Sequence, residues 1–123
     1  MAIRIYIDQG HNPVNPNAGA EGNGYREQDI VYAIGIALSE ILTSAGIETR
    51  LSRPTPTTQL GTSTATSLAA RVNDANSWGT DYFISLHTNA STSPSANGSE
   101  AFVYRLGSSA SVLAGNILSR MTA

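Results

Sequence analysis

The sequence predicts an α/β fold with a three-layer αβα arrangement, in which helices cover both faces of a twisted, mostly parallel sheet of four strands. Three patterns support this prediction. Ile3, Ile5 and Ile7 alternate with other residues, which is the period of a strand. Apolar residues recur every three or four positions over residues 30–42, as in a helix. Residues 82–86 form a nearly continuous apolar run, typical of a central parallel strand.

The first half of the chain reads as one strand–helix–strand unit. The first strand starts at Ile3 and ends at Gly10, and residues 12–24, rich in Asn, Gly and Pro, form a loop. A helix is expected over residues 25–45, with Gly46 in the position that commonly follows a helix. Residues 47–51 form the second strand. This order predicts a parallel pair of strands joined by a right-handed crossover.

The second half supplies two more helices and two more strands. The threonine-rich segment 53–66 is too polar to pack and is expected to be an exposed loop, and a helix follows over residues 67–78. The third strand covers residues 82–86 and the fourth residues 101–104, with a loop over residues 91–98 between them. A last helix, capped by Ser108 or Ser109, runs to Met121.

Composition bounds the function classes. The chain has 123 residues, 41% of them hydrophobic, which suits one globular domain. No segment is long and apolar enough to insert into a membrane. A net charge of −2, with seven scattered arginines and no lysine, argues against a nucleic-acid partner. The absence of cysteine excludes disulfides and thiolate metal sites, and the N-terminus lacks the pattern of a signal peptide.

Three potential metal ligands are expected at one edge of the sheet. His11 ends the first strand, His87 ends the third, and Glu27 lies in the first turn of the first helix. In a parallel α/β unit, strand carboxyl ends and the amino ends of the following helices share one edge. Two imidazoles and one carboxylate suit Zn²⁺ and leave a position for water. Ordinary roles stay open: each histidine as a hydrogen-bonding residue, and Glu27 as a partner of the helix dipole.

Several segments, in order along the chain, resemble motifs of zinc-dependent N-acetylmuramoyl-L-alanine amidases, the catalytic domain family of bacterial autolysins and some phage endolysins. Together they cover nearly the whole chain, and their combination is highly specific. The first matches are residues 7–11 (IDQGH), residues 18–20 (AGA) with Gly22, Gly24 and Glu27, and residues 51–53 (LSR, as the family's "LTR"). The later matches are Leu68 with Arg71, Ala75 and Asn76 ("L…R…AN"), residues 83–90 (FISLHTNA, as "FISIHxNA") and residues 98–100 ("GxE").

The resemblance implies that His11, Glu27 and His87 bind one Zn²⁺ and that the chain hydrolyses the amide between N-acetylmuramic acid and L-alanine in peptidoglycan. The metal would polarise the scissile carbonyl and activate water, while a glutamate would transfer the proton to the leaving amine. Asn89, two residues past His87, is a candidate substrate-binding residue, with a turn-forming role as the alternative. Asp8 and Arg71 are predicted to be structural: Asp8 would accept backbone N–H groups or orient a ligand, and Arg71 would brace a neighbouring loop.

Peptidoglycan is then the expected partner and the cell wall the expected place of action, in cell-wall lysis or remodelling. Without a signal peptide, the chain would be an excised domain, a phage lysin or a protein held in the cytoplasm until lysis. The sequence gives no indication of the oligomeric state.

The chain also departs from the family pattern. Family members usually have "GHGG" after the first strand, whereas here Asn12 and Pro13 follow His11. Family domains normally have six strands, and one of the last two brings the glutamate that acts as general base. The resemblance therefore implies a single catalytic domain over residues 1–123, truncated at its C-terminus, with the family's base expected beyond Ala123.

This departure leaves the catalytic base unknown, with Glu100 in the "GxE" match as a candidate. The chain as given is expected to bind zinc but to hydrolyse substrate poorly. Two other functions stay open at this point. One is a non-hydrolytic, peptidoglycan-binding or regulatory relative that keeps the fold and the metal, and the other is a zinc peptidase acting on a different amide.

Overall fold

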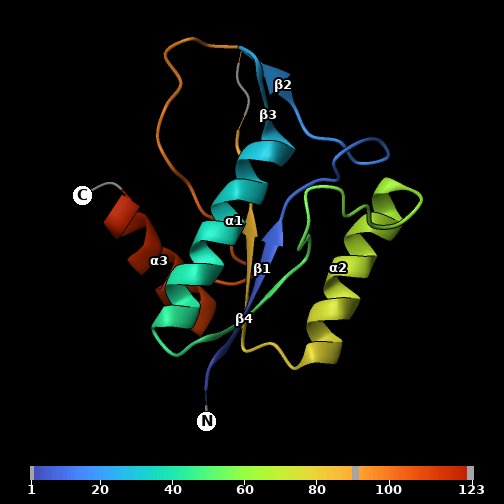
Figure 1. Cartoon of the computed structure of the whole chain (residues 1–123). Coiled ribbons are helices and arrows are strands. Elements are labelled where there is room, and N and C mark those ends of the chain that lie inside the picture. Colours follow the sequence, from blue (N-terminus) through green and yellow to red (C-terminus); the bar gives the residue numbers. More distant parts are fainter. Residues whose placement is uncertain (1, 90–91, 122–123) are drawn as a thin grey trace. The chain divides into compact units, whose positions relative to one another are not determined.

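The computed structural model describes residues 2–89 and 92–121, which belong to two compact units, Met1–Ala90 and Ser91–Ala123. Each unit is described by itself, and a single domain over residues 1–123 stays a prediction. The elements of the first unit are β1 (Arg4–Gln9), β2 (Glu21–Gly22), β3 (Tyr25–Arg26), α1 (Glu27–Ser44), β4 (Glu48–Leu51), α2 (Thr64–Trp78) and β5 (Tyr82–Leu86), and the second unit contains α3 (Ser109–Met121) (Figure 1).

The sheet of the first unit has three parallel strands in the order β4-β1-β5. Ile7 of β1 lies opposite Leu51 of β4, and Gln9 of β1 lies opposite Leu86 of β5. The parallel pairing of β1 with β4 confirms the predicted strand–helix–strand unit. The central strand is β1, however, and not the apolar run of β5. Phe83 on β5 is 43% exposed, whereas Ile7 on β1 is fully buried.

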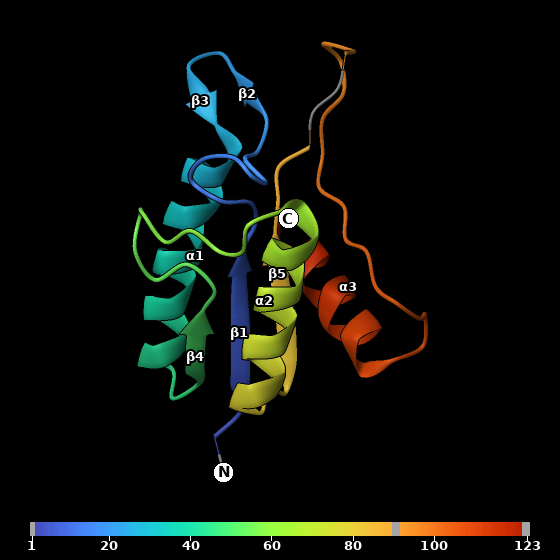
Figure 2. The same ribbon diagram turned by 90° about the vertical axis from the view of Figure 1, so that its right-hand side faces the viewer.

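Helices α1 and α2 cover opposite faces of this sheet (Figure 2). Because side chains alternate along a strand, Gln9 of β1 faces α1, while Tyr6 faces α2 and donates its hydroxyl to Asp74 at 2.8 Å. A Cβ at Gly35 of α1 would lie only 2.5 Å from Gln9 Cγ, so this glycine permits the close approach of helix and strand. The predicted α/β fold is confirmed, with three strands in the sheet instead of four.

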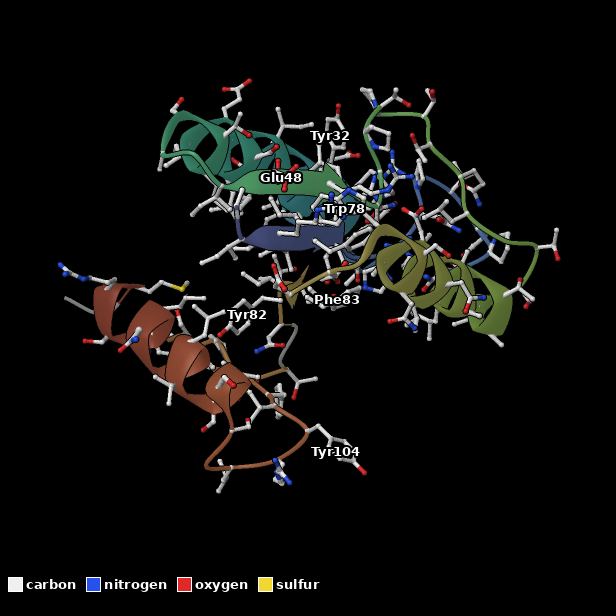
Figure 3. The ribbon with its side chains drawn as sticks, turned by 90° about the horizontal axis from the view of Figure 1, so that it is seen from below. Tyr32, Glu48, Trp78, Tyr82, Phe83 and Tyr104 are labelled. Atoms are coloured by element: carbon white, nitrogen blue, oxygen red, sulfur yellow. The ribbon has the colours of Figure 1, made fainter. Side chains whose placement is uncertain are left out.

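Aromatic side chains fill the space between the sheet and α2. The Tyr6 ring stacks on Phe83 with ring centroids 5.4 Å apart, and the Trp78 ring centroid lies 6.5 Å from that of Tyr6. Trp78 and Phe83 lie between the strands and α2 (Figure 3). Burial and the hydrogen bond to Asp74 raise the pKa of Tyr6, so its hydroxyl stays protonated as a donor.

Helix α2 starts three residues earlier than the predicted residue 67 because Ser63 caps it. The Ser63 hydroxyl accepts from the Thr66 N–H at 3.1 Å, and the Thr66 hydroxyl accepts from the Ser63 N–H at 2.9 Å. This reciprocal pair is a capping box with threonine where glutamate or glutamine is usual. The helix ends at Gly79, whose φ of 80° gives the left-handed conformation of a helix C-terminus.

A short antiparallel hairpin precedes α1. Its first strand and its turn lie in the segment that was predicted to be a loop, whereas its second strand, β3, lies where the helix was predicted to begin. Strands β2 and β3 pair across Asn23 and Gly24, which both have positive φ. An Asn-Gly pair in this conformation is typical of a tight hairpin turn. The hairpin leads directly into Glu27, the first residue of α1.

The described part of the second unit contains the predicted last helix, α3. Ser108, one of the two predicted caps, accepts at its hydroxyl from the Ser111 N–H at 3.1 Å. The predicted strand over residues 101–104 is wrong, since within the described residues this segment pairs with no strand. Phe102 and Tyr104 are exposed, so the segment lacks both the paired neighbour and the covered face that stabilise a strand. Ser91, where the predicted loop begins, lies outside the described residues.

The helices within residues 2–89 and 92–121 were compared with what a membrane-spanning helix needs. None of them combines the length and the apolar character that crossing a bilayer requires.

Two ion pairs that differ in exposure involve α2. Arg71 Nη1 lies 2.8 Å from Asp8 Oδ1, with both side chains buried, whereas the Arg50–Asp74 pair at 2.9 Å is largely exposed. The second oxygen of Asp8 accepts from the Ser85 hydroxyl at 2.6 Å. Among the described residues, Asp8 therefore accepts from two side chains, and not from the backbone N–H groups suggested by its position before the turn.

We expect Arg71→Leu to lower the free energy of unfolding by about 3–5 kcal/mol, because it leaves the Asp8 carboxylate buried without its partner. Arg50→Leu is the matched control, and it should cost less than about 1 kcal/mol because water screens an exposed pair. Urea unfolding followed by circular dichroism measures both variants. Equal losses in the two variants would contradict the structural role of Arg71, as would loss of bound metal at an unchanged melting temperature.

Candidate metal centre

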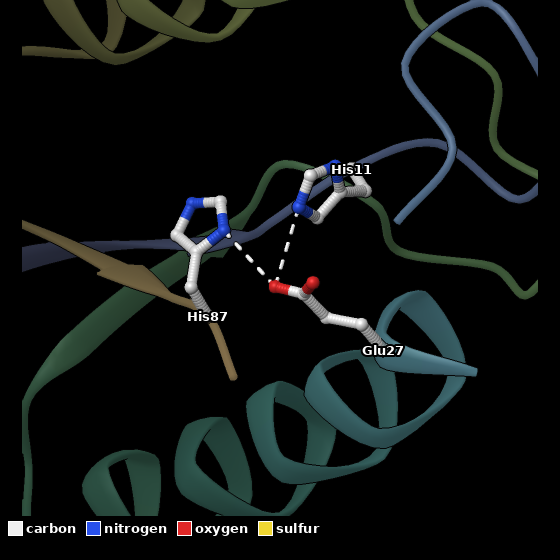
Figure 4. Close-up of side chains that lie close together, drawn as sticks. All are labelled: His11, Glu27 and His87. Carbon is white, nitrogen blue, oxygen red and sulfur yellow. Dashed lines mark hydrogen bonds and ion pairs between the residues drawn. The ribbon is translucent and has the colours of Figure 1, made fainter. Parts of the chain in front are cut away.

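His11, Glu27 and His87 meet at the carboxyl edge of the sheet, as the sequence predicted (Figure 4). His11 follows β1, His87 follows β5, and Glu27 opens α1. Glu27 Oε2 lies 3.2 Å from His11 Nε2 and 3.3 Å from His87 Nδ1. The two imidazole rings are nearly perpendicular, at 85°, with centroids 5.0 Å apart. The two histidines thus present different ring nitrogens to one carboxylate oxygen.

This geometry fits a single metal ion. Zn²⁺ binds histidine nitrogen and carboxylate oxygen at about 2.0–2.2 Å, so two ligand atoms of a tetrahedral ion lie about 3.4 Å apart. The two separations from Glu27 Oε2 are close to this value, and one potential ligand atom from each residue lies within 4.8 Å of the others. Among the residues that the structure describes, the group has three such donors. Three donors leave a tetrahedral position open, which is characteristic of catalytic zinc sites.

Backbone N–H groups fix the carboxylate of Glu27, which is 6% exposed. The Thr88 N–H donates to Oε2 at 3.0 Å and the Ala20 N–H donates to Oε1 at 3.4 Å. The Glu27 N–H in turn donates to the Ala20 carbonyl oxygen at 2.9 Å. Oε2 is therefore held toward the histidines. Sequence reasoning missed Ala20 and Thr88, because a backbone donor leaves no signature in residue type.

Gly10 and Gly19 leave the space that the cluster occupies. A Cβ at Gly10 would lie 2.5 Å from His87 Cε1. A Cβ at Gly19 would lie 3.0 Å from Glu27 Cβ and 3.1 Å from His11 Cδ2. Both glycines belong to segments that matched the family motif, but only the structure gives the physical reason for them, which is the close approach of side chains.

Two buried arginines hold the main chain that leads to His11. Arg53 donates to the carbonyl oxygens of Gln9 at 3.1 Å and Gly10 at 3.2 Å. Arg71 donates to those of Gln9 at 2.6 Å and His11 at 2.7 Å. Burial lowers the pKa of Arg53, and the positive charge of Arg71 lowers it further. The turn that carries His11 is therefore fixed from two sides.

The remaining candidates are not members of this group of potential ligands. Asn89 is exposed, two residues past His87 in the chain that follows β5, and its role in substrate binding stays a prediction. Glu100 is exposed and belongs to the second unit, on a segment outside any strand. All three members of the potential metal-binding group belong to the first unit, so the role of Glu100 as a base also stays a prediction.

Residues 5–123 match the sequence model of a family described as N-acetylmuramoyl-L-alanine amidase. The chain is 38% identical over 104 residues to the sporulation-specific N-acetylmuramoyl-L-alanine amidase of Bacillus subtilis. It is 34% identical over 99 residues to the N-acetylmuramoyl-L-alanine amidase AmiA of Escherichia coli. These alignments cover 83% and 80% of this chain but 36% and 31% of those proteins, so the chain spans about a third of their length.

Solved structures resemble the chain in the same way. The catalytic domain of the N-acetylmuramoyl-L-alanine amidase CwlV from Bacillus (Paenibacillus) polymyxa var. colistinus superposes with a TM-score of 0.65 and 28% identity, over 78% of this chain and 50% of that one. The N-acetylmuramoyl-L-alanine amidase AmiC2 of Nostoc punctiforme also superposes with a TM-score of 0.65 and 28% identity, over 78% of this chain and 49% of that one. The likeness thus extends from sequence to fold.

We expect Gly10→Ala to lower the free energy of unfolding by about 1–3 kcal/mol, since the added methyl group overpacks the site and displaces the His87 ring. Gly22→Ala is the control, because no atom lies within 4 Å of a Cβ at that position. Chemical unfolding and the NMR signals of the His87 ring measure the effects. Unchanged stability and unchanged His87 signals in Gly10→Ala would refute the close approach.

Proposed function

We propose, because this chain belongs to the N-acetylmuramoyl-L-alanine amidase family, that it binds one Zn²⁺ and hydrolyses the amide between N-acetylmuramic acid and L-alanine in peptidoglycan. His11, Glu27 and His87 would hold the ion. The observation that carries this proposal is the convergence of two imidazole nitrogens and one carboxylate oxygen within 4.8 Å. These donors are among those that Zn²⁺ prefers.

When bound, Zn²⁺ supplies Lewis-acid chemistry, which polarises a carbonyl group and makes water a stronger nucleophile near neutral pH. The chain's own residues prepare the site for it. The Ala20 N–H donates to Oε1 of Glu27 and the Thr88 N–H donates to Oε2. These two bonds fix the orientation of the carboxylate, with Oε2 toward the histidines. Donors that are already oriented lower the cost of assembling the site.

Amide hydrolysis also needs a group that takes a proton from water and passes it to the leaving amine. Both oxygens of Glu27 already accept from backbone N–H groups, and Oε2 faces two imidazole nitrogens. Glu27 therefore suits the role of a ligand better than that of a base. The resemblance does not assign this role to Glu100, but Glu100 in the "GxE" match is the candidate that we propose as a substitute base.

Peptidoglycan is the proposed partner, and the cell wall is the proposed place of action. Asn89 is proposed to hydrogen-bond the substrate, since its side chain is exposed two residues past the potential ligand His87. The amide of asparagine offers both a donor and an acceptor, which suits the peptide and N-acetyl groups of this polymer.

We expect the purified chain to contain one zinc ion per molecule, and the double variant His11→Ala/His87→Ala to contain none, because two of the three donors are gone. Asp29→Asn is the control, since Asp29 lies in the same helix turn as Glu27 but outside the cluster. Elemental analysis before and after chelation measures occupancy. Full occupancy in the double variant would rule out this site.

We expect the zinc-loaded chain to release free L-alanine amino groups from muropeptides slowly, at a rate that chelation abolishes. If Glu100 transfers the proton, Glu100→Gln lowers kcat by about 10²–10⁴ with zinc content unchanged. Labelling of new amino termini measures the reaction, and ordinary peptides serve as the control substrates. A zinc-loaded chain that binds muropeptides without cleaving them would point to a binding role instead.

A further inference from the structure

His11 has a left-handed backbone conformation, with φ of 66°. This conformation is unfavourable for a residue with a Cβ, so contacts around it must hold it in place. Arg71 Nη2 donates to the His11 carbonyl oxygen at 2.7 Å. The next N–H along the chain, that of Asn12, donates to the Asn17 carbonyl oxygen at 2.8 Å. The direction of the His11 side chain therefore depends on how Asn12 is fixed.

Asn12 is fully buried, and its side-chain amide uses its whole hydrogen-bonding capacity. Nδ2 donates to the carbonyl oxygens of Pro16 and Leu60, both at 2.8 Å. Oδ1 accepts from the Leu60 N–H at 3.0 Å and from Arg71 Nη2 at 3.1 Å. A buried amide with two donors and two acceptor positions all occupied admits one orientation.

These bonds attach the threonine-rich segment to the chain beside His11. The segment was expected to be an exposed loop too polar to pack, but Leu60 bonds to Asn12 through both its main-chain groups. Gln59 Nε2 adds a bond to the Val14 carbonyl oxygen at 3.0 Å. Polar contacts, and not apolar packing, therefore hold this part of the segment against the turn that carries His11.

We infer that Asn12 is a positioning residue for the potential metal ligand His11. Its saturated amide fixes the backbone directly after His11, and this backbone aims Nε2 at Glu27 Oε2, 3.2 Å away. Asn12 is also where this chain departs from the Gly-Gly of the motif it resembles, so these side-chain bonds are a feature of this sequence. The inference rests on the proposed function, because it concerns the same metal site.

Asn12→Asp tests this role with almost no change in shape. The carboxylate keeps the acceptor for Leu60 and Arg71 but loses both donors, and it turns an oxygen toward the carbonyl groups of Pro16 and Leu60. Because a residue that orients a ligand typically contributes 10–100-fold to metal affinity, the dissociation constant for Zn²⁺ should rise by about that factor. The visible spectrum of the Co²⁺-substituted protein, which reports ligand geometry, should change as well.

Ser39→Ala is the matched control. It removes the 2.6 Å hydrogen bond between Ser39 of α1 and Thr49 of β4, and Ser39 lies more than three helical turns beyond Glu27 in α1. A loss of stability alone should leave the Zn²⁺ dissociation constant and the Co²⁺ spectrum as they are in the unchanged protein. The comparison therefore separates positioning from general destabilisation.

Hydrogen exchange in the unchanged protein gives a second test, which decides the matter if Asn12→Asp fails to fold. Coupling between two sites is reciprocal, so Zn²⁺ should slow exchange at the Leu60 N–H, which bonds to Asn12. The Thr58 N–H is the control within the same segment, since it bonds to the Thr55 carbonyl oxygen at 3.2 Å. Zn²⁺ should slow Leu60 more than Thr58.

The outcomes distinguish this inference from the proposed function. A chain that binds neither Zn²⁺ nor Co²⁺ would overturn both. A folded Asn12→Asp variant with unchanged affinity and spectrum would overturn the inference alone. Equal slowing of the Leu60 and Thr58 amides by Zn²⁺ would do the same.

Discussion

The burial of two guanidinium groups beside the end of β1 is the constraint on which the rest of the structure depends. Arg53 and Arg71 are 1% and 2% exposed. Among the described residues, the ion pair that these arginines form with a carboxylate is the one between Arg71 and Asp8. A buried charge without partners is costly, and N–H groups of both arginines bond to main-chain oxygens of Gln9, Gly10 and His11. The bonds that satisfy the arginines are thus the bonds that shape the turn.

The potential metal site follows from that turn. His11 leaves the turn in a strained backbone conformation, Glu27 is fixed by two backbone N–H groups, and His87 follows the neighbouring strand β5. Each donor is held mainly by its own support, and not by the other donors. A site of this kind presents its ligands in place, which favours tight binding of one ion with one open position. The chain belongs to the N-acetylmuramoyl-L-alanine amidase family, and this geometry could hold a metal ion.

Much of the first unit could be predicted because its signals are local. Periodicity identified β1 and α1, a nearly continuous apolar run identified β5, and Ser108 was recognised as a possible helix cap. Errors arose where the signal was short or where a partner was needed. The capping box at Ser63 uses an unusual threonine, and the hairpin has only two residues in each strand. The strand expected over residues 101–104 had the right composition, but within the described residues it has no neighbour to pair with.

The sequence by itself determined the α/β class and the identity of the three converging side chains, because parallel strands bring their carboxyl ends to one edge whatever the details of packing. Only the tertiary structure decided that β1 is central, that His11 presents Nε2 and His87 presents Nδ1, and that Asn12 ties its turn to Leu60. These features depend on contacts between segments far apart in the chain and on backbone hydrogen bonds. Neither leaves a pattern in residue type, because any residue can supply a backbone N–H or carbonyl group at the required place.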